Sequence, residues 1–120
     1  MKQILMFTYG ILKNSGGTVK RDVTIDADMY DLGAFPAITR LGTGNKAKGN
    51  VISVSQAELD RFDQIEGVNS ENPEAGLYRR EKVWIEEIKE EVFIYLYNGG
   101  GRGSTIEEWE YHSVIEGWDL

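Results

Sequence analysis

The chain has 120 residues, of which 41% are hydrophobic and 28% charged, and its formal net charge is −7. The length predicts a single domain over residues 1–120 that can bury a hydrophobic core without disulfides or structural metals. The negative charge argues against nucleic acid and anionic membranes as partners. The absence of cysteine excludes disulfides, thiol nucleophiles and thiolate metal ligands. With neither a signal-peptide pattern nor a run of about 20 apolar residues, a cytoplasmic location is expected.

The first half of the chain predicts three strands. The apolar run from Gln3 to Thr8 is typical of a buried central strand. Val19 to Ala27 alternates between apolar and polar residues, which predicts a half-exposed strand. The segment from Tyr30 to Thr39 looks irregular and Leu41 to Lys48 resembles a polar turn region. Alternation returns from Gly49 to Val54 and predicts the next strand.

A short helix is predicted over residues 55–67. Ser55 and Glu58 have the spacing of a capping box, in which each side chain bonds the backbone of the other residue. Gly67 is a natural residue to end the helix, because it can take the left-handed conformation.

The second half predicts a long hairpin and a final helix. Leu77 to Ile88 and Val92 to Tyr97 are rich in β-formers, with a tight turn at Lys89-Glu90 between them. Ser104-Thr105 with two following glutamates offers a capping box for a helix to about Val114. About five strands and two short helices predict a small α+β domain, with a mainly antiparallel sheet curled into a partial barrel.

Glu66 is out of place on the predicted helix. At about 100° per residue it falls between Leu59 and Phe62 on the apolar face, which Ile65 extends. A carboxylate turned toward a core is costly unless it is paired or neutralised. One interpretation is a general acid or base whose pKa is raised by burial. The alternative is a helix-end glutamate that is exposed, or paired with Arg79 or Arg80.

Other segments could contribute to a site. The strand exit at Tyr9-Gly10-Ile11-Leu12 could place turn amides at a ligand, although ordinary strand exits have the same composition. Tyr78 could line a pocket or simply begin a strand. The glycine-rich segment from Asn98 to Thr105 lacks the ending of a phosphate-binding loop, so a surface loop is favoured over nucleotide binding. His112-Ser113 shows no hydrolase motif.

Taken in order, three of these segments resemble the γ-glutamylcyclotransferase-like family. They are Tyr9-Gly10-Ile11-Leu12, the run from Leu59 to Gly67 with the form Leu-Asp-x-Phe-Asp-x-x-Glu-Gly, and Tyr78-Arg79-Arg80. The resemblance implies a mixed α+β fold with a small antiparallel barrel. It also implies an enzyme that converts a γ-glutamyl amine or γ-glutamyl amino acid into 5-oxoproline and the free amine.

The resemblance assigns roles to particular residues. The catalytic glutamate of the family falls on Glu66, the substrate loop on Tyr9, Gly10, Ile11 and Leu12, and the pocket tyrosine on Tyr78. No metal or cofactor is expected, because the α-amino group of the substrate is itself the nucleophile. The alternative is a non-catalytic domain of the same fold that binds a small molecule or a protein.

Two features depart from the family pattern. Position 11 is isoleucine where the family often has serine or threonine, and the segment from Gly67 to Tyr78 is long and polar. Both bear on what the pocket accepts. The identity of the amine half of the substrate and the oligomeric state do not follow from the sequence.

Overall fold

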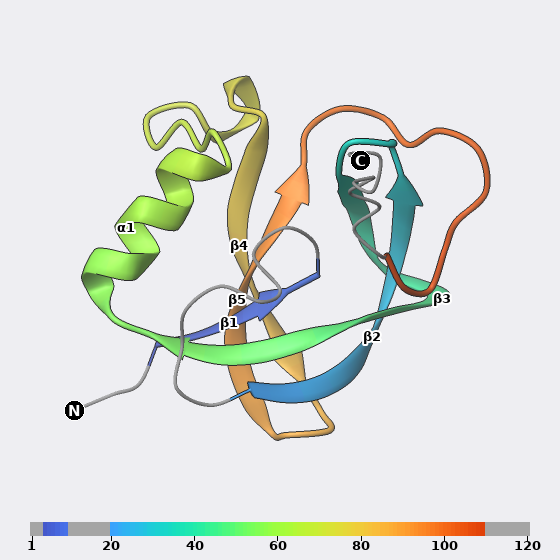
Figure 1. The fold of residues 1–120 in the computed structure, drawn as a ribbon, viewed down its shortest axis with the longest axis horizontal. Coiled ribbons are helices and arrows are strands. Elements are labelled where there is room, and N and C mark those ends of the chain that lie inside the picture. The colour runs from blue at the N-terminus through green and yellow to red at the C-terminus, as the bar shows by residue number, and fades with distance from the viewer. Residues whose placement is uncertain (1–3, 10–19, 110–120) are drawn as a thin grey trace, which may run out of the picture.

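The protein folds as a mixed α+β structure around one five-stranded sheet (Figure 1). The computed structural model describes residues 4–9 and 20–109. Its elements in chain order are β1 (Ile4–Thr8), β2 (Lys20–Asp31), β3 (Pro36–Val54), α1 (Gln56–Ile65), the 3₁₀ turn η2 (Pro73–Ala75), β4 (Tyr78–Ile85) and β5 (Glu90–Tyr97). No helix in this part of the chain is long and apolar enough to cross a membrane.

The sheet has the strand order β2-β3-β1-β5-β4. Every neighbouring pair is antiparallel except β1 and β5, which run parallel. The prediction of a central first strand is therefore confirmed. The prediction of a barrel is wrong: β2 and β4 are the two edges of the sheet and do not pair with each other, so the sheet is curved but open (Figure 1).

Only the last part of the longest strand, β3, was predicted from the sequence, as the strand from Gly49 to Val54. The segment from Tyr30 to Thr39, expected to be irregular, contains the end of β2, residues 32–35 outside the strands, and the start of β3. The predicted polar turn from Leu41 to Lys48 is wrong, because it lies within this 19-residue strand, which pairs with β2 along most of its length. Two register shifts in that ladder fall between Asp26 and Ala27 and between Asp28 and Met29. The Asp26 carboxylate accepts the Gly44 N–H at 2.6 Å, and Asp28 accepts the Asn45 side chain at 2.7 Å. Carboxylates of β2 thus accept hydrogen bonds from the part of β3 where the regular pairing of the two strands is interrupted.

The helix α1 forms where the local signals placed it. The Ser55 hydroxyl accepts the Glu58 N–H at 3.1 Å and the Glu58 carboxylate accepts the Ser55 N–H at 2.8 Å, which confirms the capping box. Gly67 ends the helix at φ +68°. Leu59 and Phe62 are buried as predicted, whereas Ile65 is 54% exposed and does not extend the apolar face.

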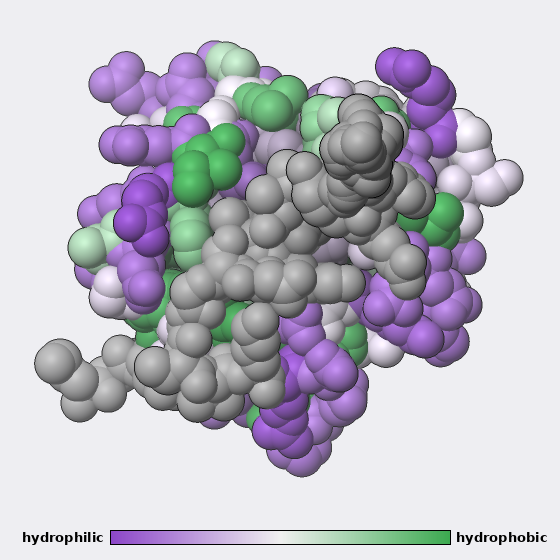
Figure 2. Space-filling model, viewed as in Figure 1, coloured by the Kyte–Doolittle hydropathy of each residue, from purple (hydrophilic) through white to green (hydrophobic). Residues whose placement is uncertain are grey.

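Two hydrophobic clusters pack on the two faces of the sheet, because successive side chains of each strand alternate. Phe7, Val51 and Ile94 belong to the larger cluster, on the face of the sheet away from α1. Met6, Ile52, Val54, Leu59, Phe62, Tyr78 and Tyr95 form the cluster that joins α1 to the sheet. The exposed surface in Figure 2 is mainly hydrophilic, with hydrophobic residues in separate patches.

The second half of the chain confirms the hairpin and corrects its ends. β4 and β5 pair from Tyr78 with Tyr97 to Ile85 with Glu90, and the connecting turn spans residues 86–89 rather than Lys89-Glu90. The segment 104–109 is not helical, contrary to the prediction. Its backbone is instead hydrogen-bonded to β2 and β3. The Ile106 N–H donates to the Met29 carbonyl of β2 at 2.8 Å, and the Lys48 N–H of β3 donates to the Glu107 carbonyl at 2.6 Å. The rest of the predicted helix, with His112 and Ser113, lies outside the described residues.

Candidate active site

Glu66 lies at the end of α1, where the helix meets the sheet. It is the C-cap residue, and its backbone N–H donates to the Phe62 carbonyl at 2.9 Å. Its side chain is half-buried, and this burial raises the pKa of the carboxyl from 4.5 to about 7. Desolvation is the cause, because no described cation or hydrogen-bond donor contacts the carboxylate to favour its charged form.

The alternative of an ion pair at Glu66 is not what the structure shows. Arg79 donates to Glu81 at 2.6 Å and to the Asn98 side chain at 2.8 Å, and Arg80 donates to Asp63 at 2.6 Å. Both guanidinium groups are therefore bound elsewhere, so neither arginine compensates the Glu66 carboxylate, and no other described cation contacts it.

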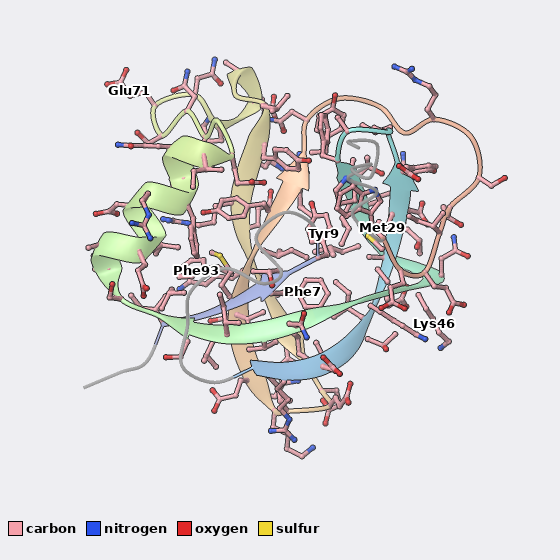
Figure 3. The ribbon with its side chains drawn as sticks, in the orientation of Figure 1. Phe7, Tyr9, Met29, Lys46, Glu71 and Phe93 are labelled. Carbon is pink, nitrogen blue, oxygen red and sulfur yellow. The ribbon has the colours of Figure 1, made fainter. Side chains whose placement is uncertain are left out.

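Three tyrosines from adjacent strands lie around this carboxyl. Tyr9 follows β1, Tyr95 lies within β5 and Tyr78 begins β4, and β5 separates the other two strands in the sheet. Figure 3 shows Tyr9 just beyond the end of β1. Burial raises the pKa of each phenol, and the negative charge of Glu66 adds to the effect at all three. The sheet order thus brings two predicted site residues, Tyr9 and Tyr78, to Glu66.

The hydroxyl protons of these tyrosines all point to other protein groups. Tyr9 donates to the Tyr95 carbonyl at 2.7 Å, Tyr78 donates to the Pro36 carbonyl at 2.7 Å and Tyr95 donates to the Asp63 carboxylate at 2.7 Å. A hydroxyl has one proton but two lone pairs. The Tyr9 oxygen already accepts the Ile38 N–H at 3.3 Å. The oxygens of Tyr78 and Tyr95 can still accept hydrogen bonds near Glu66, and none of the three hydroxyls has a proton left to give it.

Sequence reasoning gave no role to Tyr95 and Asp63. Asp63 lies three residues before Glu66, so the two carboxylates share one side of α1. Asp63 accepts from Tyr95 through one oxygen and from Arg80 through the other, at 2.7 and 2.6 Å. The Arg80 guanidinium also lies 4.7 Å from the centre of the Phe93 ring, between the sheet and α1. Helical spacing could have indicated Asp63, whereas Tyr95 depends on strand register.

An aromatic group supports Tyr78 from the other side. The rings of Phe35, Tyr78 and Tyr97 pack together with centroids 5.3 to 6.2 Å apart. Gly99 lies against the Tyr97 ring so closely that a side chain there would collide with it. In the described structure the glycine-rich segment therefore packs against this ring through Gly99.

The long segment between Gly67 and Tyr78 closes on itself. Leu77 N–H donates to the Gly67 carbonyl at 2.9 Å, which joins the two ends of the segment. The Asn98 side chain donates to the carbonyls of Pro73 and Gly76 at 2.7 and 2.8 Å. The segment is thus a structured loop fixed to the end of β5, next to the C-terminal end of α1.

The predicted substrate loop is only partly described. Gly10, Ile11 and Leu12 lie outside the described residues, so a cavity formed by their backbone and Glu66 stays a prediction. A cavity of about 540 Å³ elsewhere is lined by residues of β2, β3 and the C-terminal segment, and by Glu87. Within the described ranges, no group of histidine and acidic residues has the arrangement to hold a metal ion.

Comparison with known proteins places this chain in a family. The family model described as "Gamma-glutamyl cyclotransferase, AIG2-like" matches residues 6–113. No match was found among curated proteins.

Two solved structures share the fold. The uncharacterized protein PH0828 from Pyrococcus horikoshii has a TM-score of 0.63 and 18% identity, over 87% of this chain and 86% of that one. YkqA from Bacillus subtilis has a TM-score of 0.67 and 17% identity over 98% of this chain, which spans only 43% of YkqA. With the match to the family model over most of its length, the chain belongs to the γ-glutamylcyclotransferase, AIG2-like family.

Proposed function

We propose that this protein is a γ-glutamyl cyclotransferase. It converts a γ-glutamyl amine or γ-glutamyl amino acid into 5-oxoproline and the free amine, with Glu66 as general acid and base. The observation that carries the proposal is the half-buried, uncompensated Glu66 carboxyl, whose pKa of about 7 suits proton transfer in both directions near neutral pH. Membership of the family supports the reaction class.

The reaction needs one proton acceptor that later becomes a donor. The ionised Glu66 takes a proton from the α-ammonium of the substrate, which frees the nitrogen lone pair. This nitrogen attacks the γ-carbonyl carbon and forms the C–N bond of the ring. The protonated Glu66 gives its proton to the leaving nitrogen, and the amide C–N bond breaks. Glu66, ionised again, takes the second proton from the ring nitrogen and passes it to the released amine, which leaves as its ammonium. No water, metal or cofactor takes part, and holding the glutamyl chain curled contributes several kcal/mol by proximity alone.

The tyrosines suit the first step. Since the hydroxyl protons of Tyr78 and Tyr95 are held by protein acceptors, their oxygens offer lone pairs to a donor-rich group such as an ammonium. In the proposed complex the α-ammonium lies near Glu66 among these oxygens. The backbone amides of Gly10, Ile11 and Leu12 are proposed to hold the glutamyl carboxylate and the oxyanion.

The test is release of 5-oxoproline from a panel of γ-glutamyl amino acids and γ-glutamyl amines, with neutral, acidic and cationic leaving amines. Glu66→Gln keeps the shape of the side chain and removes the proton transfer, and we expect a rate loss of about a hundredfold or more. Glu71→Gln is the matched control, since it removes one carboxylate from an exposed position in the next loop. Full activity of Glu66→Gln would refute the catalytic assignment, and an inert wild type across the panel would favour the non-catalytic binding domain.

A further inference from the structure

One side of α1 carries two carboxylates in different states. Asp63 is saturated by Tyr95 and Arg80, while Glu66, one turn later, has no described donor. The i, i+3 spacing brings their side chains close, because residues three apart on a helix are neighbours. Both carboxylates also act on the same phenol: the Tyr95 hydroxyl is hydrogen-bonded to Asp63, and the charge of Glu66 reaches it as well.

Asp63 holds the Tyr95 proton at 2.7 Å, and Glu66, three residues further along the helix, is the second carboxylate that acts on the same phenol. A phenol rotates its single proton toward whichever acceptor is available, and an ionised carboxylate can only accept. In this structure Asp63 takes the proton at 2.7 Å and is itself fixed by Arg80, which is packed on the Phe93 ring. A bond from Tyr95 to Glu66 would favour the ionised Glu66 and weaken it as a base.

We propose that Asp63 is a positioning residue that keeps the Tyr95 proton away from Glu66, so that none of the three described tyrosines near Glu66 turns its hydroxyl proton to this carboxyl. The other groups around Glu66 agree with this arrangement: Tyr9 and Tyr78 also give their protons to carbonyls, and Arg80 is bound by Asp63. The catalytic meaning of this role rests on the proposed function, whereas the proton arrangement itself does not.

The experiment is a titration of the Glu66 side-chain carboxyl by ¹³C NMR in glutamate-labelled protein, with the signal assigned from Glu66→Gln. In wild type the titration is expected near pH 7. In Asp63→Ala the freed Tyr95 proton turns to Glu66, and the pKa falls by about one unit or more. In Asp63→Ala with Tyr95→Phe the pKa is expected to lie above its value in Asp63→Ala by about one unit or more, because the Tyr95 proton is gone. These two variants both lack the Asp63 charge and both free Arg80, so their difference isolates the Tyr95 proton.

Two results would overturn the proposal. An equal fall of the pKa in both variants would show that only the charges of Asp63 and Arg80 act on Glu66. A rise of the Glu66 pKa in Tyr95→Phe alone would show that the hydroxyl already donates to Glu66, and this variant tests the proposal even if Asp63→Ala fails to fold. The titration needs no turnover, so it stands apart from the cyclisation assay. If wild type is active, the acidic limb of its kcat/KM profile should shift to lower pH in Asp63→Ala. In the double variant this limb should shift back toward higher pH.

Discussion

Replacing Glu66 by glutamine should stabilise the fold in a pH-dependent way. The pKa of Glu66 is raised from 4.5 to about 7 in the folded protein, so between these values the folded state binds more protons than the unfolded chain. The free energy of unfolding therefore falls as the pH rises through this window and is level above it. At 1.36 kcal/mol per pKa unit the carboxylate costs about 3 kcal/mol of stability at about pH 8. Glu66→Gln removes this cost and should show a gain that is small near pH 4 and reaches about 3 kcal/mol near pH 8.

The assay is urea unfolding of wild type and Glu66→Gln at a series of pH values, with the slope m compared to confirm that the same surface is exposed. The difference between the two proteins matters rather than either curve, because the other titrating groups contribute equally to both. A buried glutamine amide without partners adds a constant offset that does not depend on pH. Glu71→Gln, from an exposed position, should give a flat difference. A flat difference for Glu66→Gln as well would refute the desolvation of Glu66 and, with it, the reasoning for its role.

Three further predictions follow from particular contacts. In wild type, kcat/KM for 5-oxoproline release should fall about tenfold per pH unit below about pH 7 as Glu66 becomes protonated, and a profile without this limb would contradict a base at that position. Gly76→Ala should lower the free energy of unfolding by about 2 kcal/mol, since its Cβ would meet the Gly67 carbonyl oxygen, and an unchanged urea midpoint would mean that the loop opens freely. Ser55→Ala should cost about 1 kcal/mol by thermal unfolding, because the Glu58 N–H loses its side-chain acceptor, with a wild-type Tm as the contrary result.

Elements whose causes are local could be predicted from the sequence. The helix is fixed by bonds between Ser55 and Glu58 and by the positive φ of Gly67, all within a dozen residues. The first strand and the β4–β5 hairpin likewise follow from apolar patterning over short runs. Glu66 was found the same way, because helical spacing alone sets it beside Leu59 and Phe62.

Features that depend on distant partners were missed. Glycines and an asparagine between residues 42 and 45 predict a turn when considered alone, yet carboxylates of β2 hold them in a strand. The segment 104–109 carries a capping pattern, but its backbone bonds Met29 and Lys48 and it is irregular rather than helical. The prediction of a barrel was wrong for a related reason. A barrel would need the edge strand β2 to pair with the other edge strand, β4, and these strands are far apart in the sequence.

The candidate site likewise has one part that depends on local sequence and another that depends on distant partners. A carboxylate on an apolar face is visible in one helix, but its protonation depends on where distant hydroxyl protons go. Tyr95 lies 32 residues from Asp63, and Tyr9 donates to a carbonyl 86 residues away. Had any of these phenols turned its proton to Glu66, the carboxyl would be a weaker base at neutral pH. Burial raises the Glu66 pKa, and the sheet order β1-β5-β4 brings three phenols near it. Each phenol gives its proton to another acceptor: Tyr9 to one on β5, Tyr78 to one on β3 and Tyr95 to one on α1.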